Sequence, residues 1–275
     1  MLKVIRVTMI GVTGRMGRAI VRAASESSEQ KNAIKIVAGI ASASSSELGK
    51  DVGTLAGVDA SGVKVTSDLH AALAQCDVAI DFSNAVAVSA NVAACKAARK
   101  PLIIGTTGLA ADVDTVVDEA ARDIAVLVAP NTSVGVTLLI ELVRAAAKTL
   151  PPEFDIEISE AHHRNKRDAP SGTALALGEA AAEGRGQAFS RAAAHPRGEG
   201  PRREGEIGYA VTRGGDIVGD HTVLFAGAGE QLLLGHRASD RAIFARGALK
   251  AAAWLTGRTP GRYCMRNVVG YKTEG

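Results

Sequence analysis

Apolar positions in the first half of the chain fall into short unbroken runs separated by longer segments of helical periodicity. The runs predict strands at residues 4–10, 34–40, 64–66, 78–82, 102–104 and 124–129. The segments between them predict helices at 84–99, 112–122 and 134–149, and a short helix that Asp68 could cap. Strands without alternation of polar and apolar residues are typical of parallel sheets that helices cover on both faces. We therefore expect a doubly wound parallel sheet, with its ligand at the carboxyl ends of the strands.

The pattern changes near residue 150. Residues 154–160 alternate apolar with polar side chains, as a half-exposed antiparallel strand does. Further strands are predicted at 207–213, 220–225 and 231–237, and the Gly- and Arg-rich segment 184–203 is predicted to be a loop. This pattern indicates a second, α+β domain with an open mixed or antiparallel sheet, one face of which other subunits would cover.

A final amphipathic helix is predicted over residues 240–256, with Ile243, Phe244, Leu249 and Trp254 among its apolar positions. We expect it to return the chain to the first domain. The predicted organisation is a first domain over 1–132, a second domain over 133–239, and a C-terminal segment over 240–275.

A glycine-rich turn follows the first predicted strand and opens a helix. The glycines at 11, 14 and 17 have the spacing G-x-x-G-x-x-G, a variant of the dinucleotide-binding fingerprint, in which they allow a tight turn and close approach of phosphates. A purely structural turn is the alternative. The position between a strand and a helix favours a nucleotide site.

The second predicted strand ends without the acidic residue that the fingerprint places about 20 residues after its glycines to bind the ribose. The run Ala41-Ser42-Ala43-Ser44-Ser45-Ser46 stands there instead. Its hydroxyls could bind a 2′-phosphate, although no Arg accompanies them. This favours NADPH over NADH, and a flexible serine loop is the alternative.

Two other turns follow predicted strands. They are Gly105-Thr106-Thr107-Gly108 and Ala129-Pro130-Asn131-Thr132. Taken alone, each is more typical of a turn than of a site. Because the carboxyl ends of parallel strands share one edge of a sheet, we expect both to contact cofactor or substrate.

The segment from Glu160 to Thr173 concentrates basic groups before a helix start. Ser171-Gly172-Thr173 leads into residues of high helix propensity, and the first amides of a helix suit a carboxylate or phosphate. His162, His163 and Lys166 add proton donors. The alternatives are an ordinary N-cap at Ser171 or Thr173 and a solvated charged loop.

We predict no metal site. Adjacent histidines diverge on either a strand or a helix, so one ion would rarely bind both His162 and His163. The sequence has no other ligands at recognised metal-binding spacings.

Composition and charge argue against some classes of protein and partner. The 275 residues carry 32 Lys and Arg against 29 Asp and Glu, a net charge of +3, and 3% aromatics, which argues against nucleic-acid and membrane partners. Three scattered cysteines favour a reducing compartment. With no run of about 20 apolar residues for a membrane helix and no signal peptide pattern, the expected location is cytoplasmic.

Several motifs together resemble the bacterial dihydrodipicolinate reductase (4-hydroxy-tetrahydrodipicolinate reductase) family of the diaminopimelate route to lysine. The resemblance covers nearly the whole chain. Its most specific part is the run EAHHRNKRDAPSGTA that begins at Glu160. The other matching segments are the glycine turn, 104–108, 131–136 and 213–222.

The resemblance implies a role for each matching residue. His162 and Lys166 match catalytic proton donors, and His163 with Gly172 and Thr173 matches the dicarboxylate-binding residues. The segments that match NAD(P)H-binding residues are Gly11-Val12-Thr13-Gly14-Arg15-Met16, Gly105-Thr106-Thr107 and Ala129-Pro130-Asn131-Thr132. The family also implies a homotetramer built through the second domain, and a hinge that closes the domains over substrate.

The sequence departs from the family in two places. Ala41 and Ser42 stand where relatives can carry an acidic residue and an Arg for the adenosine ribose, which bears on cofactor preference. Thr132 replaces a bulkier residue near the nicotinamide. The implied reaction is reduction of a small cyclic dicarboxylate by NADPH or NADH. A non-catalytic NADP(H)-binding sensor and a dehydrogenase for a different small acid are the rival hypotheses.

Overall fold

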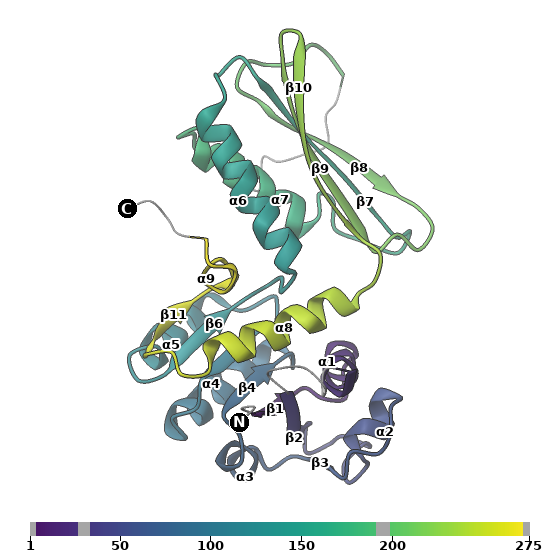
Figure 1. The fold of residues 1–275 in the computed structure, drawn as a ribbon, viewed down its shortest axis with the longest axis vertical. Coiled ribbons are helices and arrows are strands. Elements are labelled where there is room, and N and C mark those ends of the chain that lie inside the picture. The colour runs from purple at the N-terminus through teal and green to yellow at the C-terminus, as the bar shows by residue number, and fades with distance from the viewer. Residues whose placement is uncertain (1–3, 27–33, 191–198, 272–275) are drawn as a thin grey trace. The chain divides into compact units, whose positions relative to one another are not determined.

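The computed structural model describes residues 4–26, 34–190 and 199–271. The chain divides into two compact units (Figure 1). Unit 1 comprises residues 1–133 together with 242–275, and unit 2 comprises residues 134–241. Among the described residues, no helix combines the length and hydropathy needed to cross a bilayer.

Unit 1 is built on a parallel sheet whose order in the described residues is β11-β6-β5-β4-β1-β2-β3. The strands are β1 (Ile5–Ile10), β2 (Ile34–Ile40), β3 (Val65–Thr66), β4 (Val78–Asp81), β5 (Leu102–Ile104), β6 (Ala125–Val128) and β11 (Gly261–Tyr263). The chain runs outward from β1 to β3, then returns to β4 on the other side of β1. The doubly wound parallel sheet expected from the sequence is confirmed, with its switch point between β1 and β4.

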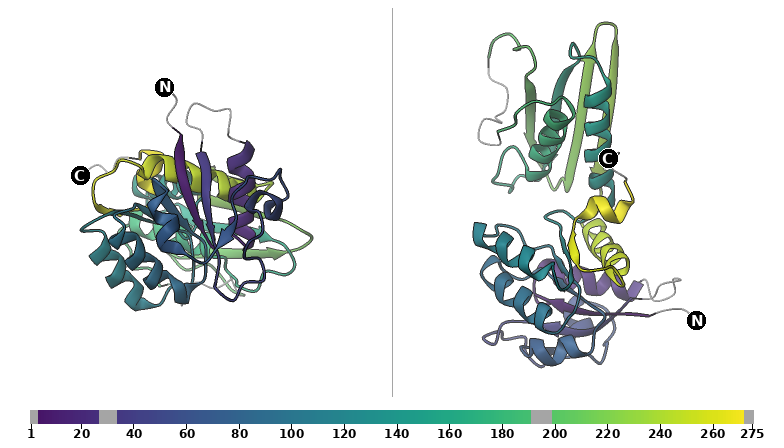
Figure 2. Two further views of the ribbon diagram at one scale, coloured as in Figure 1. Left: turned by 90° about the horizontal axis from the view of Figure 1, so that it is seen from below. Right: turned by 90° about the vertical axis from the view of Figure 1, so that its left-hand side faces the viewer.

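Helices pack on both faces of this sheet (Figure 2). On one face lie α1 (Arg15–Glu26) and α8 (Ala242–Leu255), and on the other lie α3 (Leu69–Ala74), α4 (Val88–Ala97) and α5 (Ala111–Ala120). The second group buries Val92, Cys95 and Val117 against Leu102 and Ile104 of β5. The central strands β4, β5 and β6 are therefore apolar apart from Asp81, because helices cover them on both faces.

Small elements account for most departures from the prediction. The helix α2 (Val52–Ala56), capped by Asp51, was not predicted, and α8 is not the last element, because β11 and α9 (Met265–Val269) follow it. The predicted helix 84–99 begins as the 3-10 turn η1 (Ala85–Ala87), in which Val86 is 94% exposed. The predicted Asp68 cap is confirmed, since its Oδ1 accepts a hydrogen bond from the Ala71 amide at 2.9 Å.

Unit 2 carries a mixed sheet of order β10-β9-β7-β8 in the described residues. Its strands are β7 (Asp155–His162), β8 (Ile207–Arg213), β9 (Gly219–Gly227) and β10 (Glu230–Ala238). β7 pairs antiparallel with β9 and parallel with β8, so of the two predicted alternatives, a mixed or an antiparallel sheet, the mixed sheet is confirmed. Parallel neighbours need a crossover, and α7 (Gly172–Gly184) lies between β7 and β8 in the chain.

Both long helices of unit 2, α6 (Val134–Thr149) and α7, pack on one face of this sheet (Figure 1). Ile156, Ile158, Val223 and Phe225 are buried beneath them. The described residues place no helix on the opposite face, where Leu233 is 61% exposed. Of the predicted loop 184–203, Gly184 ends α7 and residues 191–198 lie outside the described residues.

The third glycine of the turn, Gly17, is where α1 approaches the strand-to-helix turn most closely. A Cβ at this position would stand 2.3 Å from the carbonyl oxygen of Gly11 and 2.7 Å from Cα of Val12. We predict that Gly17→Ala lowers the stability of unit 1 by about 1–3 kcal/mol through overpacking. Thermal unfolding followed by circular dichroism measures this. Gly14→Ala is the matched control, because its Cβ would approach only the Gly11 oxygen, at 3.3 Å. Equal melting temperatures for the two variants would contradict the prediction.

Candidate active site

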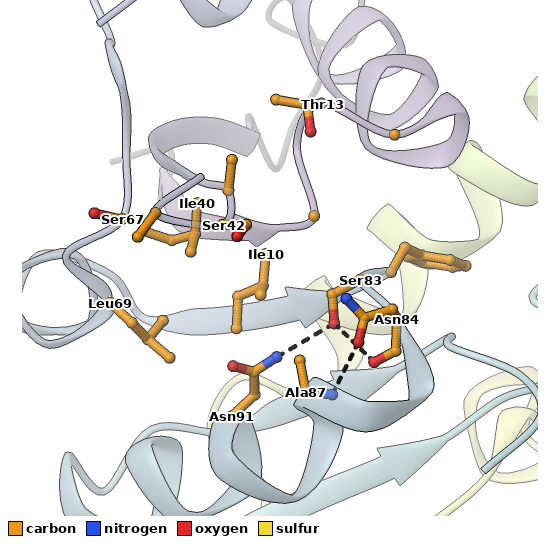
Figure 3. A pocket seen from close by; sticks show the side chains of 15 residues that line it. Ile10, Thr13, Ile40, Ser42, Ser67, Leu69, Ser83, Asn84, Ala87 and Asn91 are labelled. Carbon is orange, nitrogen blue, oxygen red and sulfur yellow. Dashed lines mark hydrogen bonds between the residues drawn. The ribbon is translucent and has the colours of Figure 1, made fainter. Parts of the chain in front are cut away.

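A cavity of about 580 Å³ lies in unit 1 at the carboxyl ends of β1, β2 and β4 (Figure 3). This is the crevice where open parallel sheets bind their ligands, and the volume suits a small molecule or part of a cofactor. The cavity is lined by Ile10, Gly11, Thr13, Gly14, Ile40, Ala41, Ser42, Ala43, Ser67, Leu69, Phe82, Ser83, Asn84, Ala87 and Asn91.

The glycine turn forms one wall of the cavity. Gly11 has φ of +82°, and a Cβ there would lie 2.5 Å from the carbonyl oxygen of Phe82, so the position requires glycine. The amides of Gly11 and Val12 both donate to the carbonyl of Ile40, at 2.9 and 3.1 Å, which fixes the turn against β2. Because α1 begins directly after the turn, the positive end of its dipole lies here and favours an anion.

A second wall, formed by Ser42 and Ser67, is rich in hydroxyl groups. Ser42 and Ser67 face Ser83, Asn84 and Asn91 across the cavity in Figure 3. The Ser42 hydroxyl lies 2.9 Å from that of Ser44 and accepts a hydrogen bond from its amide. Among the described lining residues there is no carboxylate and no guanidinium. This wall therefore carries no charge that would repel a phosphate.

Beneath the cavity, the fully buried carboxylate of Asp81 ties two strand ends together. Its Oδ2 accepts from the side chain of Asn91 at 2.8 Å, and its Oδ1 accepts from the Ser83 amide at 2.8 Å and the Thr106 hydroxyl at 3.3 Å. Sequence reasoning assigned no role to Asp81, Phe82 or Asn91. The place of Asp81 and Phe82 at the end of a predicted strand was the signal that could have indicated one, whereas Asn91 lies within a predicted helix and gave no such signal.

The turns at 105–108 and 129–132 have different surroundings. A Cβ at Gly105 would stand 2.1 Å from the ring of Phe82, so this turn lies directly against a lining residue. Ala129 is buried and donates its amide to Ile104. Asn131 accepts from the Ser133 amide at 2.8 Å. Neither turn lines the cavity itself.

The remaining predicted cofactor residues also lie outside the lining. Thr132 is buried, and its hydroxyl donates to the carbonyl of Phe244 at 2.7 Å, so it joins α8 to the end of β6. Val12 is buried, whereas Arg15 and Met16 begin α1. The cavity thus gathers Gly11, Thr13, Gly14 and Ser42 from the predicted set.

In unit 2, the predicted residues gather around the end of β7. His162 is the last residue of that strand and is 8% exposed, and its Nδ1 lies 2.5 Å from Oε2 of Glu160. Arg213, at the end of β8, donates to both carboxylate oxygens of Glu160 at 2.7 and 2.8 Å. His162 and Arg213 are register partners in the parallel pair, which explains why they meet.

Ser171 is the N-cap of α7. Its hydroxyl accepts from the Ala174 amide at 3.2 Å and lies 3.0 Å from Nε2 of His221, and its amide donates to Glu160 at 3.0 Å. The N-cap interpretation of Ser171 is therefore correct. Gly172 and Thr173 form the first turn of the helix, and a Cβ at Gly172 would meet only open space.

A tight turn carries His163 and Lys166 beyond the strand. The Lys166 amide donates to the His163 carbonyl at 3.1 Å, and its ammonium lies 2.9 Å from Oδ1 of Asp168. Arg213 donates to the Asp168 carbonyl at 2.7 Å, which fixes this turn against β8. The turn thus carries both basic side chains directly after His162.

The charges around His162 act in opposite directions. Burial lowers the pKa of its imidazole, and the cations of Lys166 and Arg213 lower it further, while the Glu160 carboxylate raises it. Burial also raises the pKa of Glu160, but its bonds to Arg213, His162 and Ser171 outweigh this and hold that pKa below its ordinary value. Burial lowers the pKa of His221 to about 4, so this imidazole is neutral near pH 7.

Sequence reasoning missed the parts played by Glu160, Arg213 and His221. Each lies in a segment that carries the family resemblance, but a single sequence does not indicate which of its residues meet. Within the ranges that the structure describes, no three His, Cys, Asp or Glu side chains gather as a metal site would require.

Comparison with known proteins identifies one family over nearly the whole chain. Residues 5–132 match the family model "Dihydrodipicolinate reductase, N-terminus", and residues 135–269 match "Dihydrodipicolinate reductase, C-terminus". The 4-hydroxy-tetrahydrodipicolinate reductase of Rhodopseudomonas palustris (strain BisA53) is 49% identical over 269 residues, which cover 96% of each chain. That of Anaeromyxobacter dehalogenans (strain 2CP-1 / ATCC BAA-258) is 47% identical and covers 97% of this chain and 98% of its own.

A solved structure agrees with the fold. The dipicolinate-bound dihydrodipicolinate reductase from Paenisporosarcina sp. TG-14 superimposes with a TM-score of 0.74 at 24% identity, over 95% of this chain and 97% of its own. The predicted resemblance is thus confirmed by both halves of the sequence. The chain belongs to the dihydrodipicolinate reductase family of oxidoreductases.

Proposed function

We propose that the chain reduces 4-hydroxy-2,3,4,5-tetrahydrodipicolinate to 2,3,4,5-tetrahydrodipicolinate with NADPH, in the diaminopimelate route to lysine. The observation that carries this proposal is the convergence of His162, the Lys166 turn and the start of α7 at one end of the unit 2 sheet. That arrangement offers proton donors beside an anion-binding helix end, as reduction of a dicarboxylate requires.

The residues of unit 1 fit a nicotinamide dinucleotide. The turn from Gly11 to Met16 would hold its pyrophosphate at the start of α1, and Ser42 would lie beside the adenosine ribose. The turns at 105–107 and 129–132 would flank the nicotinamide. When bound, the cofactor supplies a hydride to the substrate ring.

The hydroxyl-rich wall supports NADPH over NADH. An acidic residue after β2 would bind a free ribose and repel a 2′-phosphate, and Ser42 stands there instead, between Ala41 and Ala43. Serine hydroxyls can donate to a phosphate. Because no arginine lines this wall in the described residues, we expect a moderate preference for NADPH.

The start of α7 would hold the substrate carboxylates. Ser171 is buried, and its hydroxyl and amide both bond within the protein, so it shapes the helix end. The amides of Gly172 and Thr173 and the side chain of His163 would then hold the anion. The open space at Gly172 leaves room for it.

His162 and Lys166 would deliver the proton that must follow the hydride. The hydroxyl and a hydrogen of the neighbouring ring carbon leave as water, and hydride addition at the carbon that bore the hydroxyl then moves an electron pair onto the conjugated imine. An imidazolium or ammonium beside that position supplies the proton and stabilises the charge. The substrate carboxylates would themselves raise the pKa of His162 and so favour its protonated form.

The open face of the unit 2 sheet would form the subunit contact of a homotetramer. Leu224 and Leu233 are cross-strand partners on that face, and Leu233 is largely exposed. An exposed apolar sheet face is typical of a subunit interface. We therefore propose that association occurs through unit 2.

We predict that His162→Gln and Lys166→Ala each lower kcat by roughly 10²–10⁴, because a positioned acid is lost. The Kd for NADPH should barely change. The assay follows absorbance of the reduced nicotinamide, with substrate made in situ by the preceding synthase. Lys148→Ala, which removes an exposed lysine at the end of α6, is the control. Near-normal turnover in both catalytic variants would refute the assignment, and a wild-type chain that binds NADPH without oxidising it would favour a sensor.

Gly14→Val should abolish NADPH binding without unfolding unit 1. Gly14 is exposed, it lines the cavity, and its only close Cβ neighbour is the Gly11 oxygen at 3.3 Å, so the added side chain fills space meant for phosphates. Cofactor fluorescence titration measures binding, and the melting temperature without cofactor checks the fold. Retained affinity at an unchanged melting temperature would place the cofactor elsewhere.

Ser42→Asp should reverse the cofactor preference. A carboxylate there would repel the 2′-phosphate and accept from the 2′-hydroxyl, so the Kd for NADPH should rise at least about tenfold while that for NADH falls. Ser42→Ala removes the hydroxyl without adding charge and should change both constants little. If Ser42→Asp shifted both constants equally, Ser42 would not face the ribose.

A further inference from the structure

The carboxylate of Glu160 is enclosed by hydrogen-bond donors. Oε2 lies 2.5 Å from Nδ1 of His162 and accepts from Arg213 at 2.7 Å. Oε1 accepts from the Ser171 amide at 3.0 Å and from the second arm of Arg213 at 2.8 Å. Glu160 is only 2% exposed. A buried carboxylate with a bidentate guanidinium and two further donors is well matched in charge and in hydrogen bonds.

We propose that Glu160 is the positioning residue of this site, fixing the ring orientation and tautomer of His162 so that Nε2 faces the substrate. Arg213 holds the carboxylate ionised in its buried position. The inference rests on the proposed role of His162 as proton donor, and it assigns the function of that donor's partner.

The tautomer follows from the donors and acceptors present. An ionised carboxylate only accepts hydrogen bonds, so the nitrogen of His162 that faces it, Nδ1, must carry a proton. The neutral ring then has its lone pair on Nε2, and the proton for transfer is gained and lost there. A Cβ at Gly219 would lie 3.1 Å from Nε2, so glycine at that position leaves space at the reacting nitrogen.

The charges facing His162 make Glu160 the group that favours its protonated form. Lys166 and Arg213 are cations and disfavour an imidazolium, and His221, 5.1 Å away between ring centroids, is neutral near pH 7. Asp168 is occupied by Lys166. Loss of the Glu160 charge would therefore lower the pKa of His162, since the carboxylate is what raises it.

Glutamine cannot replace this carboxylate. An amide has one accepting oxygen and one donating nitrogen. In either orientation its NH₂ group would face two donors, either His162 with Arg213 or Ser171 with Arg213. Only the orientation that directs NH₂ toward His162 can be relieved, because Nδ1 can give up its proton and accept from the amide, which leaves the ring as the Nε2–H tautomer, whereas the Ser171 amide cannot become an acceptor. Aspartate keeps the charge on a side chain shorter by one methylene.

Nitrogen-15 NMR of histidine-labelled protein without substrate tests the tautomer directly. The chain has six histidines, and the signals that vanish in His162→Gln identify the ring. We expect Nδ1–H in the wild type and in Glu160→Asp, and Nε2–H in Glu160→Gln. Glu141→Gln is the matched control, because Glu141 is 3% exposed and ion-paired to Arg144 in the same unit. Nε2–H in the wild type would overturn the proposal, as would an unchanged tautomer in Glu160→Gln.

Kinetics supply a second readout. A proton donor works only when protonated, so kcat falls as pH rises through the pKa of His162. Glu160→Gln should lower kcat by roughly 10²–10⁴ and move that fall to lower pH, with little change in KM. Glu160→Asp should largely restore the wild-type pH profile, and Glu141→Gln should leave it unchanged.

A uniform loss of rate with an unmoved pH profile would overturn the proposal by making Glu160 merely structural. If Glu160→Gln fails to fold, the wild-type tautomer and the Glu160→Asp profile still decide. A wild-type enzyme that does not oxidise NADPH with the substrate rejects the proposed function instead. The tautomer, measured without substrate, is independent of that outcome.

Discussion

The candidate site of unit 2 is organised around one buried carboxylate, that of Glu160, whose burial costs free energy unless its charge and oxygens are matched. Glu160 loses its water, so its oxygens must be matched by donors from the protein. His162 is supplied by β7, Arg213 by β8 and Ser171 by the cap of α7. The three elements are the parts of one parallel crossover, whose geometry places the ends of β7 and β8 at one edge with the start of α7 beside them. The crossover that defines this part of the fold therefore also supplies the donors to Glu160.

Unit 1 also buries a carboxylate at the edge of its sheet. Asp81 is fully buried at the end of β4, and its donors come from neutral groups, Ser83, Asn91 and Thr106. No cation holds this carboxylate in the described residues that contact it. The network instead joins the turns after β4 and β5 through neutral donors alone. A buried carboxylate is thus matched in two ways, by a guanidinium beside the proposed proton donor and by neutral amide and hydroxyl groups where the turns are shaped.

The elements that could be predicted from the sequence are those that the properties of neighbouring residues determine. The bounds of β2, β5 and α6 were predicted to the residue, because each has strong periodicity or propensity between clear breaks. The short elements α2 and β11 were missed, since five and three residues carry no measurable period. The parallel pairing of β7 with β8 was missed because partner choice depends on a crossover distant in sequence. Glu160 belongs to the segment that the sequence singled out, but its partner Arg213 is 53 residues away. The sequence alone does not indicate that the two side chains meet.

Ser171 shows that the structural and functional interpretations of a residue can be compatible. Its hydroxyl caps α7, as the structural interpretation predicted, and its amide donates a hydrogen bond to Glu160. With these groups engaged inside the protein, the first turn of α7 is fixed relative to His162 through the shared carboxylate. A substrate anion held by that turn would therefore be placed at a set distance from the imidazole. Under the proposed function, the cap would contribute to catalysis through its structural role, because the same buried carboxylate positions the helix end and the proposed proton donor.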